Sequence, residues 1–264
     1  MKIGFIGCGN MATAMLKGIL KSGEVEASDM IASAKSDKTR KKIEKELGIR
    51  KADNNAQVVD FADVVFLAVK PQFLEGVLDE IRGSVKAGQI FISIAPGKTL
   101  QWLGERLGEN TKVIRTMPNT PAMVGEGMTA LCVNELVTEE ETALAVKLCD
   151  TFGKTEVIPE HLMDAVVGVS GSSPAYVFMF LEAMADAAVA DGMPRAQAYK
   201  FAAQSVLGSA KLMQETGKHP GELKDMVCSP AGTTIQAVRV LEEKGFRSAV
   251  IEAQTECVKK AKGM

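Results

Sequence analysis

Gly7-Cys8-Gly9-Asn10-Met11-Ala12 directly follows the apolar run Ile3-Gly4-Phe5-Ile6, and this stretch decides the fold. A buried strand, a G-x-G-x-x-A turn and then an apolar-striped helix are typical of a dinucleotide-binding βα unit. The glycines allow a tight turn and a close approach of backbone N–H groups to a pyrophosphate, which would lie at the positive helix N-terminus. An ordinary βα turn would not need two glycines at this spacing.

Composition limits the possible classes of protein. The chain has 264 residues, 46% of them hydrophobic, which is enough for two domains. A net charge of -2 gives no electrostatic surface for nucleic acid or an anionic membrane. Five cysteines without C-x-x-C spacing and only two histidines predict neither a disulfide framework nor a metal site.

The sequence pattern predicts neither a targeting signal nor a membrane-spanning segment. The chain opens on a strand rather than on a basic, cleavable leader, and no apolar stretch approaches the roughly 18 residues that span a bilayer. We therefore expect a cytoplasmic protein that contacts neither membrane nor nucleic acid.

Strand and helix patterns alternate through about residue 160. Runs typical of strands lie at 29–33, 63–69, 89–94, 112–116, 128–133 and 155–158, and helical patterns at 36–47, 71–82, 99–107 and 138–152. This βα alternation predicts an α/β fold with a Rossmann-type, doubly wound, mostly parallel sheet over residues 1–160.

Residues 161–264 have helical patterns throughout, at 161–169, 174–190, 195–215, 223–227, 234–244 and 246–262. We predict an all-α second domain here. The segment 174–190 is apolar around nearly its whole circumference, so it must be buried. About a hundred residues have few ways to surround one helix, so we expect a partner subunit to cover it.

The end of the second strand indicates which nicotinamide cofactor is used. NAD-specific sites place Asp or Glu there, but this chain has Ser33-Ala34-Lys35-Ser36, and Asp29 precedes the strand. Ser33, Lys35 and Arg40 would offer a 2′-phosphate hydrogen-bond donors with no repelling carboxylate. We therefore expect NADPH to be preferred, while NADH remains possible.

Further cofactor contacts should follow the strands, because ligands of open α/β sheets lie beyond the carboxyl ends of the strands. Asn55 opens a short helix and is placed on the adenosine side. The candidate cofactor-binding residues are Ile6, Gly7, Cys8, Gly9, Asn10, Met11, Ser33, Lys35, Asn55, Ala68, Val69, Lys70, Pro71, Ala95, Met117 and Asn119. A plain strand-to-helix turn remains the alternative for each segment taken alone.

Two irregular stretches interrupt the helical domain. Cys228-Ser229-Pro230-Ala231-Gly232-Thr233-Thr234 leads into a helix, where free N–H groups suit a carboxylate and a threonine hydroxyl could address a neighbouring nitrogen. Ser170-Gly171-Ser172 precedes the apolar helix, with Pro174 in its first turn. Simple helix caps are the alternative for both.

The whole chain resembles the pyrroline-5-carboxylate reductase family. The resemblance is carried by Gly7-x-Gly9, Phe66 to Pro71, Arg115-x-Met117-Pro118-Asn119-Thr120-Pro121, Ser170-Gly171-Ser172 with Pro174-Ala175-Tyr176, and Leu223-Lys224-Asp225 through Ser229-Pro230-x-Gly232-x-Thr234. It implies that NADPH reduces pyrroline-5-carboxylate to proline, with Ser229, Gly232, Thr233 and Thr234 holding the substrate. It also implies a homodimer that pairs through the helical domain and could extend to a ring of dimers.

Imine reduction needs a hydride donor opposite the C=N carbon and a protonated or hydrogen-bonded nitrogen. Our hypothesis is that the Thr234 hydroxyl contacts the ring nitrogen as the catalytic residue, while the proton arrives with the substrate as iminium or through water. A β-hydroxyacid dehydrogenase is one rival, but its lysine-to-asparagine motif is missing because no asparagine follows Asn134. A non-catalytic nucleotide sensor is the other.

Overall fold

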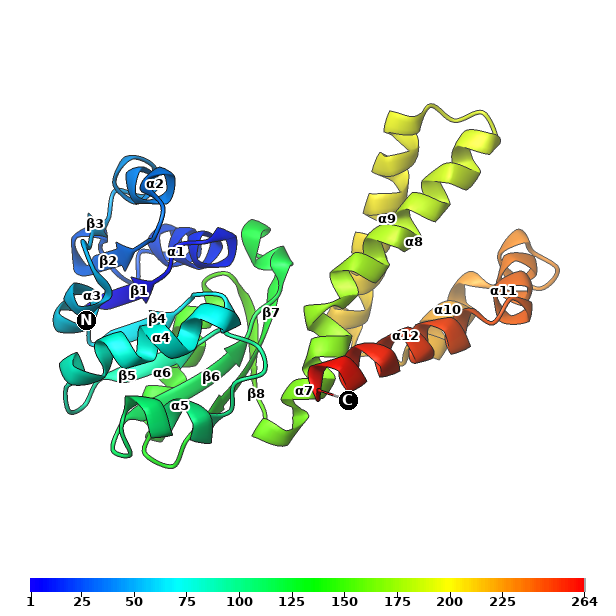
Figure 1. The fold of residues 1–264 in the computed structure, drawn as a ribbon. Coiled ribbons are helices and arrows are strands. Elements are labelled where there is room, and N and C mark those ends of the chain that lie inside the picture. Colours follow the sequence, from blue (N-terminus) through cyan, green and yellow to red (C-terminus); the bar gives the residue numbers. More distant parts are fainter. Residues whose placement is uncertain (264) are drawn as a thin grey trace. The chain divides into compact units, whose positions relative to one another are not determined.

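The computed structural model describes residues 1–263, with the side chains of Asp37 and Lys42 left out. The chain divides into two compact units, Met1–Gly171 together with Val258–Met264, and Ser172–Cys257 (Figure 1). Residue 264, the last of the predicted helical domain, lies outside the described residues.

The first unit is built on one sheet of eight strands in the order β3-β2-β1-β4-β5-β6-β7-β8. All neighbouring strands are parallel except β6 and β7, which are antiparallel. The strands are β1 (Ile3–Ile6), β2 (Met30–Ser33), β3 (Arg50–Lys51), β4 (Val64–Leu67), β5 (Ile90–Ser93), β6 (Lys112–Met117), β7 (Gly127–Val133) and β8 (Gly153–Val157). The predicted Rossmann-type sheet is confirmed, and β3 is a short strand that the sequence patterns did not reveal.

Helices cover both faces of this sheet (Figure 1). They are α1 (Asn10–Ser22), α2 (Asp37–Leu47), α3 (Asn55–Phe61), α4 (Pro71–Ile81), α5 (Leu100–Leu107) and α6 (Glu139–Asp150). Phe5 and Phe66, stacked with ring centroids 4.5 Å apart, lie in a core with α1, α2 and α6. Ile6, Val65 and Phe91 face the opposite core with α3, α4 and α5. The sheet is thus doubly wound, which leaves the carboxyl ends of its strands open to a ligand.

The first unit continues beyond the last strand to Gly171, whereas the strand pattern predicted a boundary at residue 160. Glu160 explains part of this difference, because its carboxylate accepts hydrogen bonds from Arg115 of β6, at 3.0 Å, and from the N–H of Leu100, at 2.7 Å. Met163, in α7 (Met163–Val166), is buried against Ala130 and Cys132 of β7. A π-helical turn, Val167–Gly171, completes this unit.

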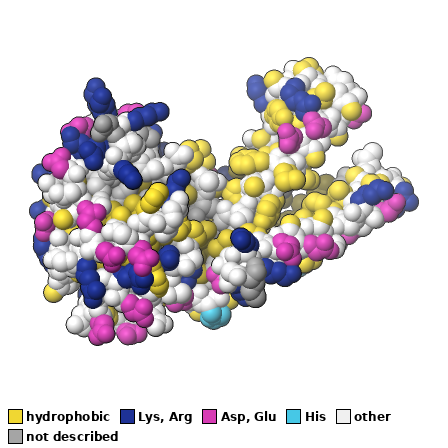
Figure 2. All heavy atoms as spheres, viewed as in Figure 1, with side chains coloured by type: hydrophobic (Ala, Val, Ile, Leu, Met, Phe, Trp, Pro, Cys, Tyr) yellow, Lys and Arg dark blue, Asp and Glu magenta, His cyan; other side chains and the backbone are white. Residues whose placement is uncertain are grey.

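The helical elements that follow are α8 (Ser173–Ala190), α9 (Arg195–Thr216), α10 (Pro220–Val227), α11 (Thr233–Glu243) and α12 (Phe246–Ala261). The predicted helices all form. Only Ala185, Ala198 and Ala202 are buried among the residues of the second unit, all of which are described. Phe178 and Met179 of α8 are 64% and 69% exposed, and apolar side chains cover much of this unit (Figure 2). The expected burial of α8 is therefore not achieved within one chain.

The expectation that no apolar stretch approaches a membrane-spanning length was wrong. The helical segment Glu160–Ala190 has 31 residues, a mean hydropathy of 1.2 in its most apolar window, and only 6% of that window buried. By length and composition alone it could cross a bilayer. The same properties fit a helix that another subunit covers, so this finding is weak evidence for a membrane.

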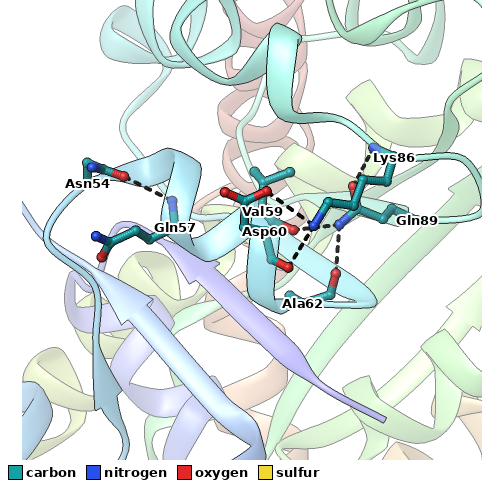
Figure 3. Close-up of polar contacts among 7 residues, drawn as sticks. All are labelled: Asn54, Gln57, Val59, Asp60, Ala62, Lys86 and Gln89. Carbon is teal, nitrogen blue, oxygen red and sulfur yellow. Dashed lines mark hydrogen bonds and ion pairs between the residues drawn. The ribbon is translucent and has the colours of Figure 1, made fainter.

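Gln89 fixes the position of α3 at the amino-terminal edge of the sheet. Its side-chain amide donates to the carbonyls of Val59, at 2.6 Å, and Ala62, at 2.7 Å, while its oxygen accepts from the N–H of Lys86 (Figure 3). Gln89 is only 6% exposed. At the other end of α3, the Asn54 side chain caps the helix by accepting from the N–H of Gln57. Both ends of α3 are therefore held.

Replacing Gln89 with methionine should reduce the free energy of unfolding by about 2 kcal/mol, because two buried carbonyls would lose their donor. Guanidinium unfolding followed by circular dichroism measures this loss. Gln101→Met is the matched control, since the exposed Gln101 amide donates to Glu105 on the same helix and its loss should cost under about 0.5 kcal/mol. Equal stability of the two variants would refute the role given to Gln89.

Candidate functional site

Gly7 lies where three strand ends meet. Its N–H donates to the Ser33 carbonyl at 3.1 Å, and its φ of +93° is in the left-handed region. A Cβ atom here would lie 2.6 Å from the carbonyl oxygen of Ala68. The protein's own backbone therefore requires glycine at this position.

Gly9 differs, because no protein atom lies within 4 Å of the Cβ position that a side chain would occupy. It is the N-cap of α1 and makes no side-chain cap hydrogen bond. The first turn of a helix leaves backbone N–H groups without intrahelical partners, and they attract an anion. The open space at Gly9 thus fits a diphosphate. A bound diphosphate would explain the glycine at this position, whereas the packing of the protein itself does not require it.

A cavity of about 410 Å³ opens beside this turn, at the carboxyl ends of β1, β2 and β4. It is lined by Gly7, Ser33, Ala34, Lys35, Arg40, Asp53, Asn54, Asn55, Val69, Phe73, Gly76, Val77 and Glu80. Five of the predicted cofactor residues are brought together here: Gly7, Ser33, Lys35, Asn55 and Val69.

Ser33, Asn55 and Glu80 form a hydrogen-bonded chain along the cavity wall. The Ser33 hydroxyl donates to Asn55 Oδ1 at 2.6 Å, and Asn55 Nδ2 donates to Glu80 Oε2 at 2.7 Å. The backbone N–H of Asn55 also donates to Glu80 Oε1, at 3.4 Å. Asn55 is thus held from both sides by β2 and α4.

Charges of both signs face the cavity. Lys35 Nζ lies 5.5 Å from the ring centroid of Phe73, and the Arg40 guanidinium donates to the carbonyl of Ala34 at 2.7 Å. Asp53 and Glu80 also line the cavity. The expectation of a site without carboxylates was therefore wrong, because the turn before α3 brings Asp53 and α4 brings Glu80, and neither belongs to the second strand.

The remaining predicted cofactor residues lie around the cavity without lining it. Ile6 and Cys8 are buried, so they can offer a ligand only their backbone, and Asn10 and Met11 form the first turn of α1. Ala68 follows β4, Lys70 is the N-cap of α4, and Pro71 is its first residue. Ala95 and Met117 lie at the ends of β5 and β6.

Asn119 has a structural task in this fold. Its Nδ2 donates to the carbonyl of Ser170 at 3.0 Å, and its Oδ1 accepts from the N–H of Met128 at 2.8 Å. The side chain is 8% exposed. Asn119 therefore joins the loop after β6 to β7 and to the π-helical turn, and its predicted contact with the cofactor is left mainly to its backbone.

Two buried cysteines, Cys132 of β7 and Cys149 of α6, are not poised for covalent chemistry. Burial, with a smaller contribution from the Glu160 carboxylate, raises the pKa of Cys132 to about 12, against the opposing effect of Arg115. Burial likewise raises the pKa of Cys149 to about 12. Both residues are thiols at neutral pH and so poor nucleophiles.

The second unit carries the predicted substrate residues in the turn before α11. Ala231 has a φ of +58°, the only positive φ outside glycine among the described residues. The N–H of Gly232 donates to the Ser229 carbonyl at 3.0 Å, and a Cβ atom on Gly232 would collide with Ser229 Oγ. Gly232 is the N-cap of α11 and makes no side-chain cap hydrogen bond, so the first N–H groups of this helix, at Thr233 and Thr234, have no intrahelical partner.

Comparisons with known proteins identify two family models along the chain. Residues 160–264 match the family model described as pyrroline-5-carboxylate reductase dimerisation, and residues 2–97 match NADP oxidoreductase coenzyme F420-dependent. The pyrroline-5-carboxylate reductase of Escherichia coli (strain K12) is 56% identical over 260 residues, covering 98% of this chain and 97% of that protein. The chain belongs to the pyrroline-5-carboxylate reductase family.

Solved structures of the pyrroline-5-carboxylate reductase family share the fold. The enzyme from Coxiella burnetii is 33% identical, with a TM-score of 0.93 and coverage of 99% of this chain and 97% of that one. The enzyme from Plasmodium falciparum, solved with NADP bound, is 28% identical, with a TM-score of 0.89 and coverage of 100% and 97%.

The acidic residues that line the cavity, Asp53 and Glu80, were missed from the sequence, as were Asn54, Phe73, Gly76 and Val77. Glu80 lies near the end of α4, 25 positions after Asn55, and no motif of the pyrroline-5-carboxylate reductase family named above includes it. Only the packing of α4 beside α3 brings it to the cavity. Within residues 1–263, no three His, Cys, Asp or Glu side chains gather as metal ligands would.

Proposed function

We propose that this protein reduces 1-pyrroline-5-carboxylate to L-proline, the last step of proline biosynthesis, with NADPH as the preferred reductant and NADH as a possible one. The observation that carries the proposal is the 56% identity to a reductase of this name over nearly the whole chain. The open N-terminus of α1 and the cavity beside it support the use of a dinucleotide.

The cofactor would be held by backbone groups from Ile6 to Met11 and by the strand-end segment Ala68 to Pro71. Asn55 would meet the adenosine half, and Lys35 with Arg40 would face a 2′-phosphate. When bound, the reduced nicotinamide supplies the hydride for C5 of the substrate.

The substrate carboxylate would be bound by the N-terminus of α11, where the helix dipole and the free N–H groups favour an anion. Ser229 and Thr233 would complete this site. The Thr234 hydroxyl would then contact the ring nitrogen and orient the imine. The strained backbone at Ala231 supports this assignment, because such conformations concentrate at functional turns.

The proton on the ring nitrogen of the substrate has to come from a source other than the turn before α11. No carboxyl or imidazole group lies in the turn from Cys228 to Thr234, and a threonine hydroxyl is a weak acid. The substrate nitrogen would therefore enter as iminium, so that hydride addition at C5 directly yields the secondary amine, or would take its proton from water.

The assembly proposed for this function is a homodimer through the helical domain, residues 161–264, which could extend to a ring of dimers. The exposed apolar side chains of α8 support it, since a matching copy would remove them from water. We propose the cytoplasm as the compartment, with no membrane or nucleic-acid partner.

The test is oxidation of NADPH, and separately of NADH, by the purified protein with and without pyrroline-5-carboxylate. We expect oxidation that depends on the imine and has a higher kcat/KM with NADPH. Nucleotide binding without imine-dependent oxidation would overturn the proposal and favour a sensor.

A further inference from the structure

The hydrogen bonds that link the side chains of Glu80, Asn55 and Ser33 can run in only one direction. A glutamate carboxylate accepts hydrogen bonds and donates none, so the Asn55 atom 2.7 Å from Glu80 must be the amide nitrogen. The other end of the amide is then the oxygen, which can only accept. The Ser33 hydroxyl, 2.6 Å away, has to donate its single proton to that oxygen.

Ser33 consequently has no proton left for a ligand. It lines the cavity at the end of β2, where dinucleotide folds hold the adenosine ribose, and it can present only lone pairs there. Lone pairs suit a ribose hydroxyl, which can donate. They do not suit the oxygens of a 2′-phosphate, which are acceptors.

We propose that Glu80 is a positioning residue that sets the hydrogen-bond polarity of Ser33 and so reduces the preference of the site for a 2′-phosphate over a ribose hydroxyl. This inference rests on the proposed use of a nicotinamide dinucleotide. Lys35 and Arg40 line the cavity from the side of β2 and α2, and Asp53 and Glu80 line it from the side of α3 and α4. Glu80 differs from Asp53 in that both its carboxylate oxygens are bound to Asn55.

The Glu80→Gln substitution tests the direction of the chain. A glutamine amide can donate to Asn55 Oδ1, which allows the Asn55 amide to reverse, present its nitrogen to Ser33 and release the serine proton toward the cavity. Affinities of the purified protein for 2′,5′-ADP and for 5′-ADP, measured by calorimetry, report on this without any turnover. We expect the affinity ratio of 2′,5′-ADP to 5′-ADP to rise about five- to tenfold.

Glu75→Gln is the matched control, because it removes the same charge from the same helix. Glu75 is ion-paired with Arg106 and does not line the cavity. Its loss should leave the affinity ratio unchanged. A ratio that stays at the wild-type value in Glu80→Gln, in a protein that still binds both nucleotides, would overturn the proposal.

A double variant separates a change in hydrogen-bond direction from a simple charge effect. With Ser33→Ala in place, Glu80→Gln should shift the ratio by less than about twofold, since no serine proton remains to be redirected. An equally large shift in that background would mean that Glu80 acts through space, which overturns the inference. If the wild-type protein binds both nucleotides but does not reduce the imine, the proposed function is wrong. The inference about Glu80 would still be tested by the affinity ratios.

Discussion

Replacing Thr234 with alanine is expected to lower kcat for imine reduction by about two orders of magnitude, with NADPH affinity changed by less than about twofold. The reason is that the hydroxyl at the start of α11 is assigned to the ring nitrogen, where the charge changes during hydride transfer. The nucleotide groups lie in the other compact unit of the chain. Steady-state kinetics together with NADPH binding by fluorescence separate the two effects.

Two variants make the Thr234 experiment specific. Thr234→Ser keeps the hydroxyl and should recover most of the rate. Thr255→Ala makes the same substitution at an exposed position of α12, where the hydroxyl donates to the carbonyl of Ile251 in the same helix, and should leave kcat unchanged. An unchanged kcat in Thr234→Ala would refute the catalytic role of this threonine.

Replacing Gly9 with alanine is expected to weaken NADPH binding by about ten- to a hundredfold while leaving the fold intact. The added methyl group meets no protein atom, but it enters the space in front of α1 where the diphosphate would lie. Calorimetry of NADPH binding and thermal unfolding of the same protein measure both quantities.

Gly7→Ala is the contrasting variant and should lose about 2–4 kcal/mol of stability. Its methyl group would meet the carbonyl of Ala68 in a backbone conformation that alanine rarely adopts. If instead Gly9→Ala bound NADPH as tightly as the wild type, the phosphate-binding role of this turn would be wrong.

The sheet was predictable because buried parallel strands are continuous apolar runs. Ile3–Ile6 and Val64–Leu67 are entirely buried, and each precedes a turn with glycine or proline. β3 could not be found from the sequence, because it has only two exposed residues, Arg50 and Lys51, which pair with β2. Its pairing depends on the neighbouring strand rather than on its own pattern.

The sequence pattern also failed to predict exposure within one chain where the burial of a helix depends on a surface outside that chain. The apolar circumference of α8 indicated a buried helix, yet its side chains are exposed within a single chain. Sequence reveals that such a face needs a cover but cannot distinguish a subunit from a bilayer. The family's dimerisation model over residues 160–264 favours the subunit.

The candidate site was only partly predictable for a similar reason. Gly7 and Ser33 lie at strand ends, where topology alone brings them together, and Asn55 opens the helix that follows the short strand β3. Glu80 reaches the same cavity from the far end of α4, and Asn119 uses its amide to hold neighbouring backbone. These roles arise from tertiary packing, which no local pattern encodes.

The most direct test of the account follows the hydride itself. The purified protein would be incubated with pyrroline-5-carboxylate and NADPH that carries deuterium in the transferred position, and the products analysed by mass spectrometry and NMR. The account predicts one proline per NADP formed, with a single deuterium at C5. NADP formed without proline, or proline with deuterium at another carbon, would contradict it.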